Sequence, residues 1–104
     1  MNASELRKQI EAEIGNDWSR TNLHNVDLRA SLLSEPRKII VVDASGERII
    51  PVWLVLEECP EANTGYGVVY SEEDAAFGLV QFAEGYEACL FGIYGSFINT
   101  FDAM

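Results

Sequence analysis

The sequence predicts an α+β fold, in which an N-terminal amphipathic helix packs on an antiparallel meander of four or five strands, with the option of a short C-terminal helix. Leu6, Ile10 and Ile14 recur at a spacing of four, which is typical of a helix with one apolar face. The second half alternates β-branched or aromatic runs with short turns, and short connections favour sequential antiparallel pairing. The 104 residues fit a single domain, 1–104.

The first helix is expected over residues 3 to 14. Charged side chains fill the face opposite its three apolar residues. Asn2 or Ser4 can cap its start, and Gly15 provides a natural end. This helix is the available cover for one face of the sheet.

Residues 16 to 36 have an ambiguous pattern. Trp18 is expected to anchor this connection to the core. The run VDLRASLL (26–33) fits a short helix with Val26, Ala30 and Leu33 on one side, or a strand in which Leu28, Ala30 and Leu32 alternate. We favour a helical turn that ends before Ser34-Glu35-Pro36, because the residue before a proline resists the α region.

The strands are expected in the remainder of the chain. Pro51 cannot donate a ladder hydrogen bond, so it marks a bulge, an edge position or the true start of its strand. The tail GSFINTFDAM forms either a final helical turn or a docked segment. The expected strands cover residues 38–44, 47–58, 66–70, 77–82 and 86–94.

Charge is distributed very unevenly along the chain. The formal net charge is −10, and all seven basic residues fall within the first 48 positions, beside eight acidic ones. Residues 49 to 104 carry nine acidic residues and no Lys or Arg. The carboxylates of this second half therefore stay solvated, reach across to the first half, or meet a cationic partner.

This charge pattern disfavours two classes of partner. Nucleic acid and anionic membrane surfaces are both recognised by clustered Lys and Arg, which the second half lacks. No apolar window approaches the length of a spanning helix, and no secretory signal opens the chain. We expect a cytoplasmic location, in which Cys59 and Cys89 are free thiols.

No motif in the sequence predicts catalysis, a metal site or a cofactor. Gly92 and Gly95 resemble a phosphate loop only in spacing, and the surrounding charge would repel a phosphate. His24 lies in an expected loop, and no catalytic signature surrounds either cysteine. The acidic turn SEEDAA lacks the spacing of a calcium loop. We therefore predict no catalytic residue, and the chain favours a binding protein over an enzyme.

Aromatic and acidic residues of the second half form the predicted partner-binding site. Aromatic side chains anchor protein interfaces, and charges steer the approach of a partner. The size and acidity of the chain are similar to those of small bacterial immunity proteins, which neutralise basic toxins; the resemblance covers these bulk properties alone. The predicted site consists of Glu57, Glu58, Glu61, Glu72, Glu73, Asp74, Tyr66 and Tyr70.

Three functional hypotheses follow. The first is a small acidic binding module, immunity-like, that acts on a cationic protein. The second is a small-molecule-binding domain or enzyme with a pocket between the sheet and the first helix, lined by Trp18, Trp53 and tyrosines, with His24 supplying chemistry. The third is a homo-oligomer whose exposed sheet face or edge pairs with itself.

Overall fold

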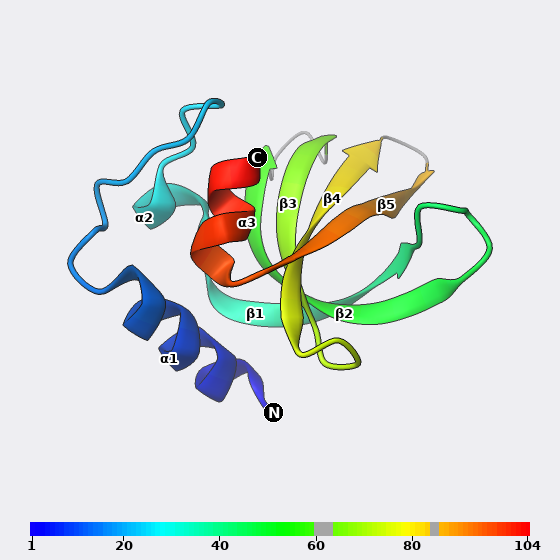
Figure 1. Cartoon of the computed structure of the whole chain (residues 1–104), viewed down its shortest axis with the longest axis horizontal. Helices are drawn as coiled ribbons and strands as arrows, with labels where there is room; N and C mark the ends of the chain where they lie inside the picture. The colour runs from blue at the N-terminus through cyan, green and yellow to red at the C-terminus, as the bar shows by residue number, and fades with distance from the viewer. Residues whose placement is uncertain (60–63, 84–85) are drawn as a thin grey trace.

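The computed structural model describes residues 1–59, 64–83 and 86–104. Helices lie at both ends of the chain, with the strands between them (Figure 1). In chain order the elements are α1 (Ala3–Ile14), α2 (Leu28–Ser31), β1 (Leu32–Val42), β2 (Ile49–Cys59), β3 (Thr64–Ser71), β4 (Ala76–Ala83), β5 (Tyr86–Gly95) and α3 (Phe97–Ala103).

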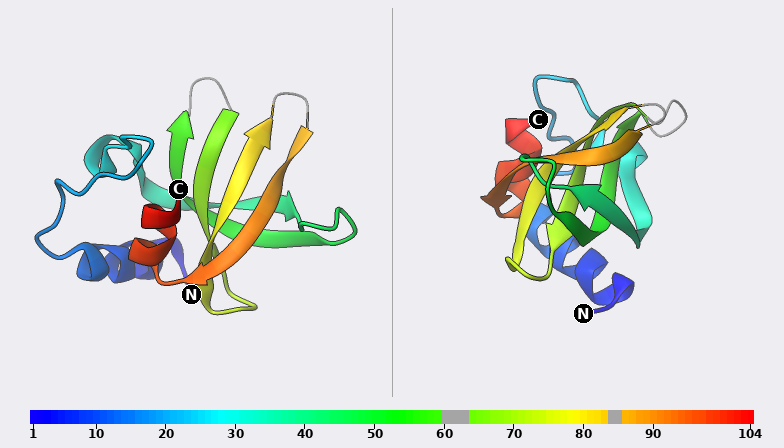
Figure 2. Two further views of the ribbon diagram at one scale, coloured as in Figure 1. Left: turned by 45° about the horizontal axis from the view of Figure 1, so that its top comes forward. Right: turned by 90° about the vertical axis from the view of Figure 1, so that its right-hand side faces the viewer.

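The five strands form a closed barrel. Each strand pairs antiparallel with the next one along the chain, which confirms the predicted α+β fold with a meander. The barrel closes where β1 meets β5 in parallel, through Val41↔Ala88 and Val42↔Cys89. The sequence did not predict this closure. The three helices gather on one side of the barrel, as Figure 2 shows.

The inside of the barrel holds one hydrophobic cluster. Alternate residues of the strands point inward, as the period of a β-strand requires. Val41 is fully buried between its neighbours on β2 and β5, which are the two strands that β1 joins. The buried members are Val41, Ile50, Val52, Leu54, Val69, Val80, Ala88 and Leu90.

A second cluster lies between the barrel and its helices. Leu6, Ile10 and Ile14 are all buried in it, which confirms the predicted apolar face of α1. Aromatic rings connect the barrel to α3, with Phe77 packed on Tyr70 at 4.9 Å between ring centroids and on Phe97 at 5.7 Å. Trp18 packs against the same cluster, as predicted for the anchor of its connection.

Local hydrogen bonds fix the ends of the helices. Asn2 and Glu5 form a reciprocal capping box at the start of α1, and Gly15 ends the helix at a positive φ of 59°. The Glu13 carboxylate accepts from the backbone N–H groups of Phe97 and Ile98 at 3.2 and 3.5 Å. Glu13 thereby joins the end of α1 to the start of α3.

The connection from residue 16 to residue 36 corrects part of the prediction. A helical turn is present as α2, but it ends at Ser31, and β1 already begins at Leu32. The buried residue of the turn is Leu28, whereas Ala30 is exposed, and the Asp27 side chain caps the turn by accepting from the Arg29 and Ala30 backbone N–H groups. Pro36 lies within β1, where the register with β2 shifts between Leu32 and Arg37. This irregularity accommodates the missing proline donor.

The other strand predictions agree closely with the structure. Pro51 is the third residue of β2 and pairs with Ile40 of β1, before the β3 pairing begins at Trp53. It therefore has a strand partner on the β1 side alone, which matches the predicted edge position, whereas the strand itself starts at Ile49. The tail forms α3, the predicted short C-terminal helix. No helix within the described ranges is long and apolar enough to cross a membrane.

Two glycines let the barrel close tightly. A Cβ at Gly67 would lie 2.7 Å from Phe82 Cε2, so the absent side chain leaves room for this ring inside the barrel. A Cβ at Gly78 would lie 2.5 Å from the backbone oxygen of Gly92 on β5. The backbone cannot yield as a flexible side chain could, so β4 and β5 need glycine at this position.

Substitution of Gly78 tests this packing. We expect Gly78→Ala to lower the free energy of unfolding by about 1–3 kcal/mol, because the new methyl group forces the two strands apart. Gly92→Ala is the matched control, since its Cβ would meet only the Tyr94 ring at an ordinary 3.7 Å. We expect that change to stay within about 0.5 kcal/mol. Equal stability of both variants in chemical denaturation would contradict the role of Gly78.

Candidate functional site

Five acidic residues of the second half lie beside cationic or imidazole side chains of the first half. Of the three predicted alternatives for these carboxylates, the structure confirms that they reach across to the first half of the chain. The N···O distances are 2.6 Å for His24–Glu58, 2.7 Å for Arg37–Glu57, 3.5 Å for Lys38–Glu72 and 3.2 Å for Arg48–Glu73, and Arg20 also contacts Asp102 directly.

Glu72 is held by both an aromatic and a basic side chain. The indole Nε1–H of Trp53 donates to its Oε1 at 2.7 Å, and Lys38 lies 3.5 Å from the same oxygen. The Lys38 ammonium also lies over the Trp53 ring, 4.7 Å from the centroid. The hydrogen bond from Trp53 and then the charge of Lys38 lower the pKa of Glu72 from its ordinary value.

The other acids of the β3–β4 turn also have intramolecular contacts. Arg48 donates to both carboxylate oxygens of Glu73 at 3.2 Å, although both side chains are largely exposed. Ser71 donates its hydroxyl to Asp74 Oδ2 at 2.9 Å. An exposed ion pair of this kind is weak and screened by salt. The predicted cluster of Glu72, Glu73 and Asp74 is thus largely engaged within the chain.

Glu57 and Glu58 lie at the far end of β2. Glu57 is only 8% exposed and accepts from Arg37 Nη2 at 2.7 Å. Glu58 is half-buried, and its two oxygens have different partners: Oε2 lies 2.6 Å from His24 Nδ1, and Oε1 accepts from the Tyr66 backbone N–H at 3.1 Å. Glu61, also predicted for the site, lies outside the described residues.

The two predicted tyrosines lie in different environments. Tyr70 is 7% exposed and packs on Phe77, which leaves little of its ring for a partner. Tyr66 is half-buried between two rings, His24 at 5.2 Å and Phe91 at 5.6 Å. Tyr66 therefore lies between the His24–Glu58 pair and the exposed aromatic ring of β5.

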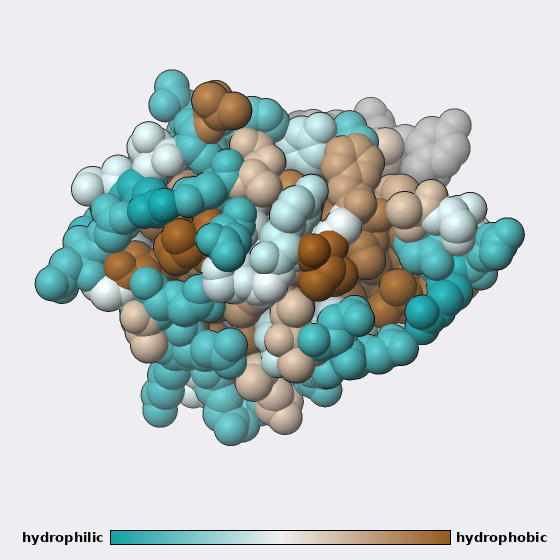
Figure 3. All heavy atoms as spheres, viewed as in Figure 1, coloured by the Kyte–Doolittle hydropathy of each residue, from teal (hydrophilic) through white to brown (hydrophobic). Residues whose placement is uncertain are grey.

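An exposed apolar surface, which the sequence did not predict, lies on the outside of β1, β2 and β5. Ile49, Ile40 and Phe91 are 66%, 58% and 48% exposed. Val42 pairs with Ile49 on one side and Cys89 on the other, so the three strands present one continuous surface. Figure 3 shows hydrophobic atoms along β5 and between β5 and the ends of β1 and β2. We call this surface the outer strip; it consists of Ile40, Val42, Ile49, Pro51, Cys89 and Phe91.

The outer strip was visible in the sequence as a strand that is apolar on both faces. The run KIIVVDA (38–44) is apolar on both faces, a pattern that is typical of a central strand covered on both sides. In the barrel its second face points outward instead. The strip ends at one side in the Lys38–Trp53–Glu72 group, through Lys38↔Trp53 beside Ile40↔Pro51. At the other side lies the β1–β2 turn, with Asp43 and the exposed Glu47.

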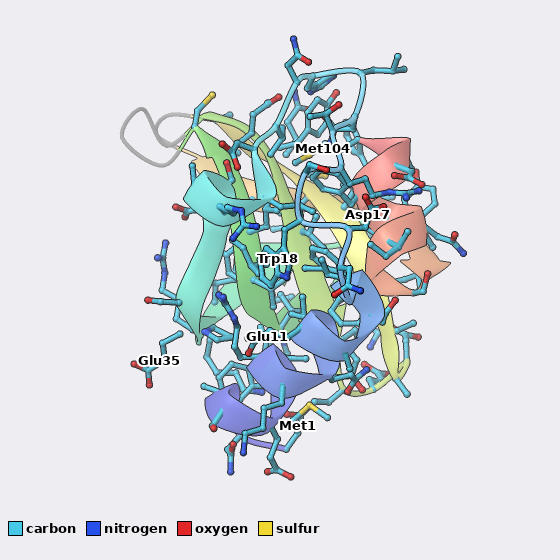
Figure 4. The ribbon with its side chains drawn as sticks, turned by 90° about the vertical axis from the view of Figure 1, so that its left-hand side faces the viewer. Met1, Glu11, Asp17, Trp18, Glu35 and Met104 are labelled. Atoms are coloured by element: carbon cyan, nitrogen blue, oxygen red, sulfur yellow. The ribbon has the colours of Figure 1, made fainter. Side chains whose placement is uncertain are left out.

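Two grooves lie beside α1 and the connection that follows it. One, of about 310 Å³, is lined by α1 and β1 and includes Arg7, Lys8, Glu11 and Glu35. The second, of about 350 Å³, lies beside Trp18 and includes Arg20, Asp27 and Arg29. Figure 4 shows Trp18 between α1 and α2, and Glu35 pointing away from the body of the molecule. Trp18, one of the residues expected for a small-molecule pocket, lines the second groove, but neither groove is lined by His24, Trp53 or a tyrosine.

The remaining reactive groups do not assemble into a site within the described ranges. Cys59 and Cys89 are both free, as the sequence predicts. No group of three or more His, Cys, Asp or Glu side chains that could hold a metal ion occurs among the described residues. Comparison of the chain with protein-family models, curated proteins and solved structures found no match.

The Trp53–Glu72 hydrogen bond can be tested by titration. We expect Trp53→Phe to raise the pKa of Glu72 toward its ordinary value, because the largest cause of its depression is removed. A lowered folded-state pKa contributes stability at neutral pH that is lost as the pH falls through the titration of Glu72. The variant should therefore lose less stability on acidification. Carboxyl NMR titration measures the shift, and Trp18→Phe should leave Glu72 unchanged.

Proposed function

We propose that the protein is an acidic protein-binding module that recognises a cationic protein partner. The observation that carries this proposal is the outer strip, an exposed apolar surface on a chain of net charge −10. Contiguous exposed apolar surface marks interaction sites, and long-range charge selects the sign of the partner and speeds its approach. A cytoplasmic location is part of the proposal.

The intramolecular ion pairs change which carboxylates we expect to take part in binding a partner. Glu57, Glu72 and Glu73 are paired with cations of the chain, so each pair is nearly neutral and contributes little to the long-range field or to direct contacts. Reversing Glu72, Glu73 and Asp74 together would also break the contacts to Trp53, Arg48 and Ser71. A clean test of steering therefore needs carboxylates without such roles.

Site-specific cross-linking can identify the partner. A photoreactive amino acid at Ile49 should capture a protein of net positive charge from the native cell, whereas the same group at Glu35, on the helical side, should not. Raising the salt from about 0.05 M to about 0.5 M should reduce the yield, since the charges become screened. Capture of acidic proteins, or equal capture from both positions, would contradict the proposal.

Charge reversal beside the strip tests steering with the captured partner. Glu47 is exposed and adjoins the start of β2, and Glu47→Lys should slow association about tenfold at low salt. Glu35→Lys changes the net charge equally on the far side and should have a smaller effect. Stopped-flow or surface-binding kinetics provide both rates. Identical rates for the two variants would show that the strip is not the contact surface.

A further inference from the structure

Strand β5 has a free edge beside the outer strip. On one side β4 pairs with it from Tyr86 to Gly95. On the other side β1 reaches it only at Ala88 and Cys89, because β1 ends at Val42. Within the described ranges, residues 90–95 therefore have strand partners on the β4 side alone. Backbone N–H and C=O groups in this stretch that point away from β4 have no ladder partner there.

The side chains along this edge are accessible. Phe91, Ile93 and Tyr94 are 48%, 39% and 44% exposed, and the hydrophobic atoms along β5 in Figure 3 lie at the surface. Gly95 has open space around its Cβ position, whereas the Tyr94 ring lies 3.7 Å from the Cβ position of Gly92. An added strand would reach the backbone directly at Gly95 and would meet the Tyr94 ring beside Gly92.

The edge lacks charged residues and proline, two of the usual protections against strand pairing. Proteins normally guard exposed edges with Lys, Pro or other charged residues. No charged residue and no proline lies between Glu87 and Asp102. Bulges are the other common guard, and β5 has register shifts opposite Leu79–Val80 and Phe77–Gly78. Between these shifts, Gly92 and Ile93 keep regular pairing with β4, so a short regular segment is presented.

We propose that the free edge of β5, Leu90–Gly95, binds an extended segment of the cationic partner by strand addition. This inference rests on the proposed function and specifies its mode of binding. In strand addition, backbone hydrogen bonds supply affinity and alternate side chains supply specificity. Apolar residues of the added segment would contact Phe91, and its basic residues would meet the field of the acidic half.

Charge distinguishes between the two occupants considered for the free edge of β5, a basic segment of another protein and a second copy of this chain. The chain carries a net charge of −10, so its long-range field favours a basic segment over an acidic one. A second copy of this chain would also carry −10, and two such molecules repel each other at low salt. The partner strand is therefore a basic, apolar segment of a different protein.

A model peptide provides the test. The probe is a peptide of about ten residues in which Lys and Val alternate. At low ionic strength we expect it to slow hydrogen exchange of the amides in residues 90–95 by about tenfold. The same peptide with every second backbone nitrogen methylated loses the donors of one edge, and an alternating Glu-Val peptide has the wrong charge. Both control peptides should give no protection.

Two variants separate edge binding from binding at the strip alone. Phe91→Lys places a charge on the free edge of β5 and should lower the affinity for the Lys-Val peptide about tenfold. Ile49→Lys adds the same charge on β2, away from the edge, and should lower this affinity less. Both side chains are about half exposed or more, so we expect both variants to fold, with circular dichroism as the check.

The outcomes distinguish this inference from the proposed function. Protection at residues 90–95 that disappears on backbone methylation supports strand addition. If the peptide and the captured partner slow hydrogen exchange only at Ile40 and Ile49, strand addition is overturned. The proposed function as a binding module is then still supported. Failure of the peptide and of every cationic protein to protect any part of the barrel overturns both. Concentration-dependent protection of 90–95 without peptide identifies a second copy as the occupant and overturns the choice of partner.

Discussion

The short parallel pairing of β1 with β5 is the constraint on which the rest of the structure depends. It joins Val41 and Val42 to Ala88 and Cys89, and so turns a meander into a barrel with its own interior core. Because β1 ends where β5 continues, the same junction leaves the second part of β5 without a neighbour on that side. Closure therefore creates the hydrophobic core and the free edge of β5 together. Gly78 permits both by letting β5 approach β4 closely.

Charge segregation along the sequence becomes charge pairing in space. The basic residues of the first half reach carboxylates of the second half at several places, from Arg37–Glu57 at β2 to Arg20–Asp102 at α3. Arg20 lowers the pKa of Asp102 chiefly through its side-chain hydrogen bond. These pairs connect segments far apart in the chain, so they favour the native arrangement over other packings of the same strands. Many are exposed and individually weak, and their value lies in specificity.

The sequence was sufficient to predict the helices and strands, but not the pairing of β1 with β5 that closes the barrel. The period of Leu6, Ile10 and Ile14 predicted α1, and the turn signals predicted the strand order, because both depend on local chemistry. Closure depends on the twist accumulated over five strands, which no local pattern records. The outer strip was missed for the same reason: apolar residues such as Ile40 on both faces of a strand indicate burial in a flat sheet, yet face solvent in this barrel. The contacts of Glu58 with His24 likewise required the three-dimensional fold.

The free edge of β5 and the large net charge of the chain have opposite effects on self-association. A standard interface takes about 800 Å² from each partner, roughly a seventh of the 5795 Å² surface of this chain. The outer strip and the free edge of β5 adjoin, so one extended partner segment can cover both. An unguarded apolar edge would otherwise promote association between copies. The charge of −10 opposes this self-association, and under the proposed function it also favours basic partners at the edge.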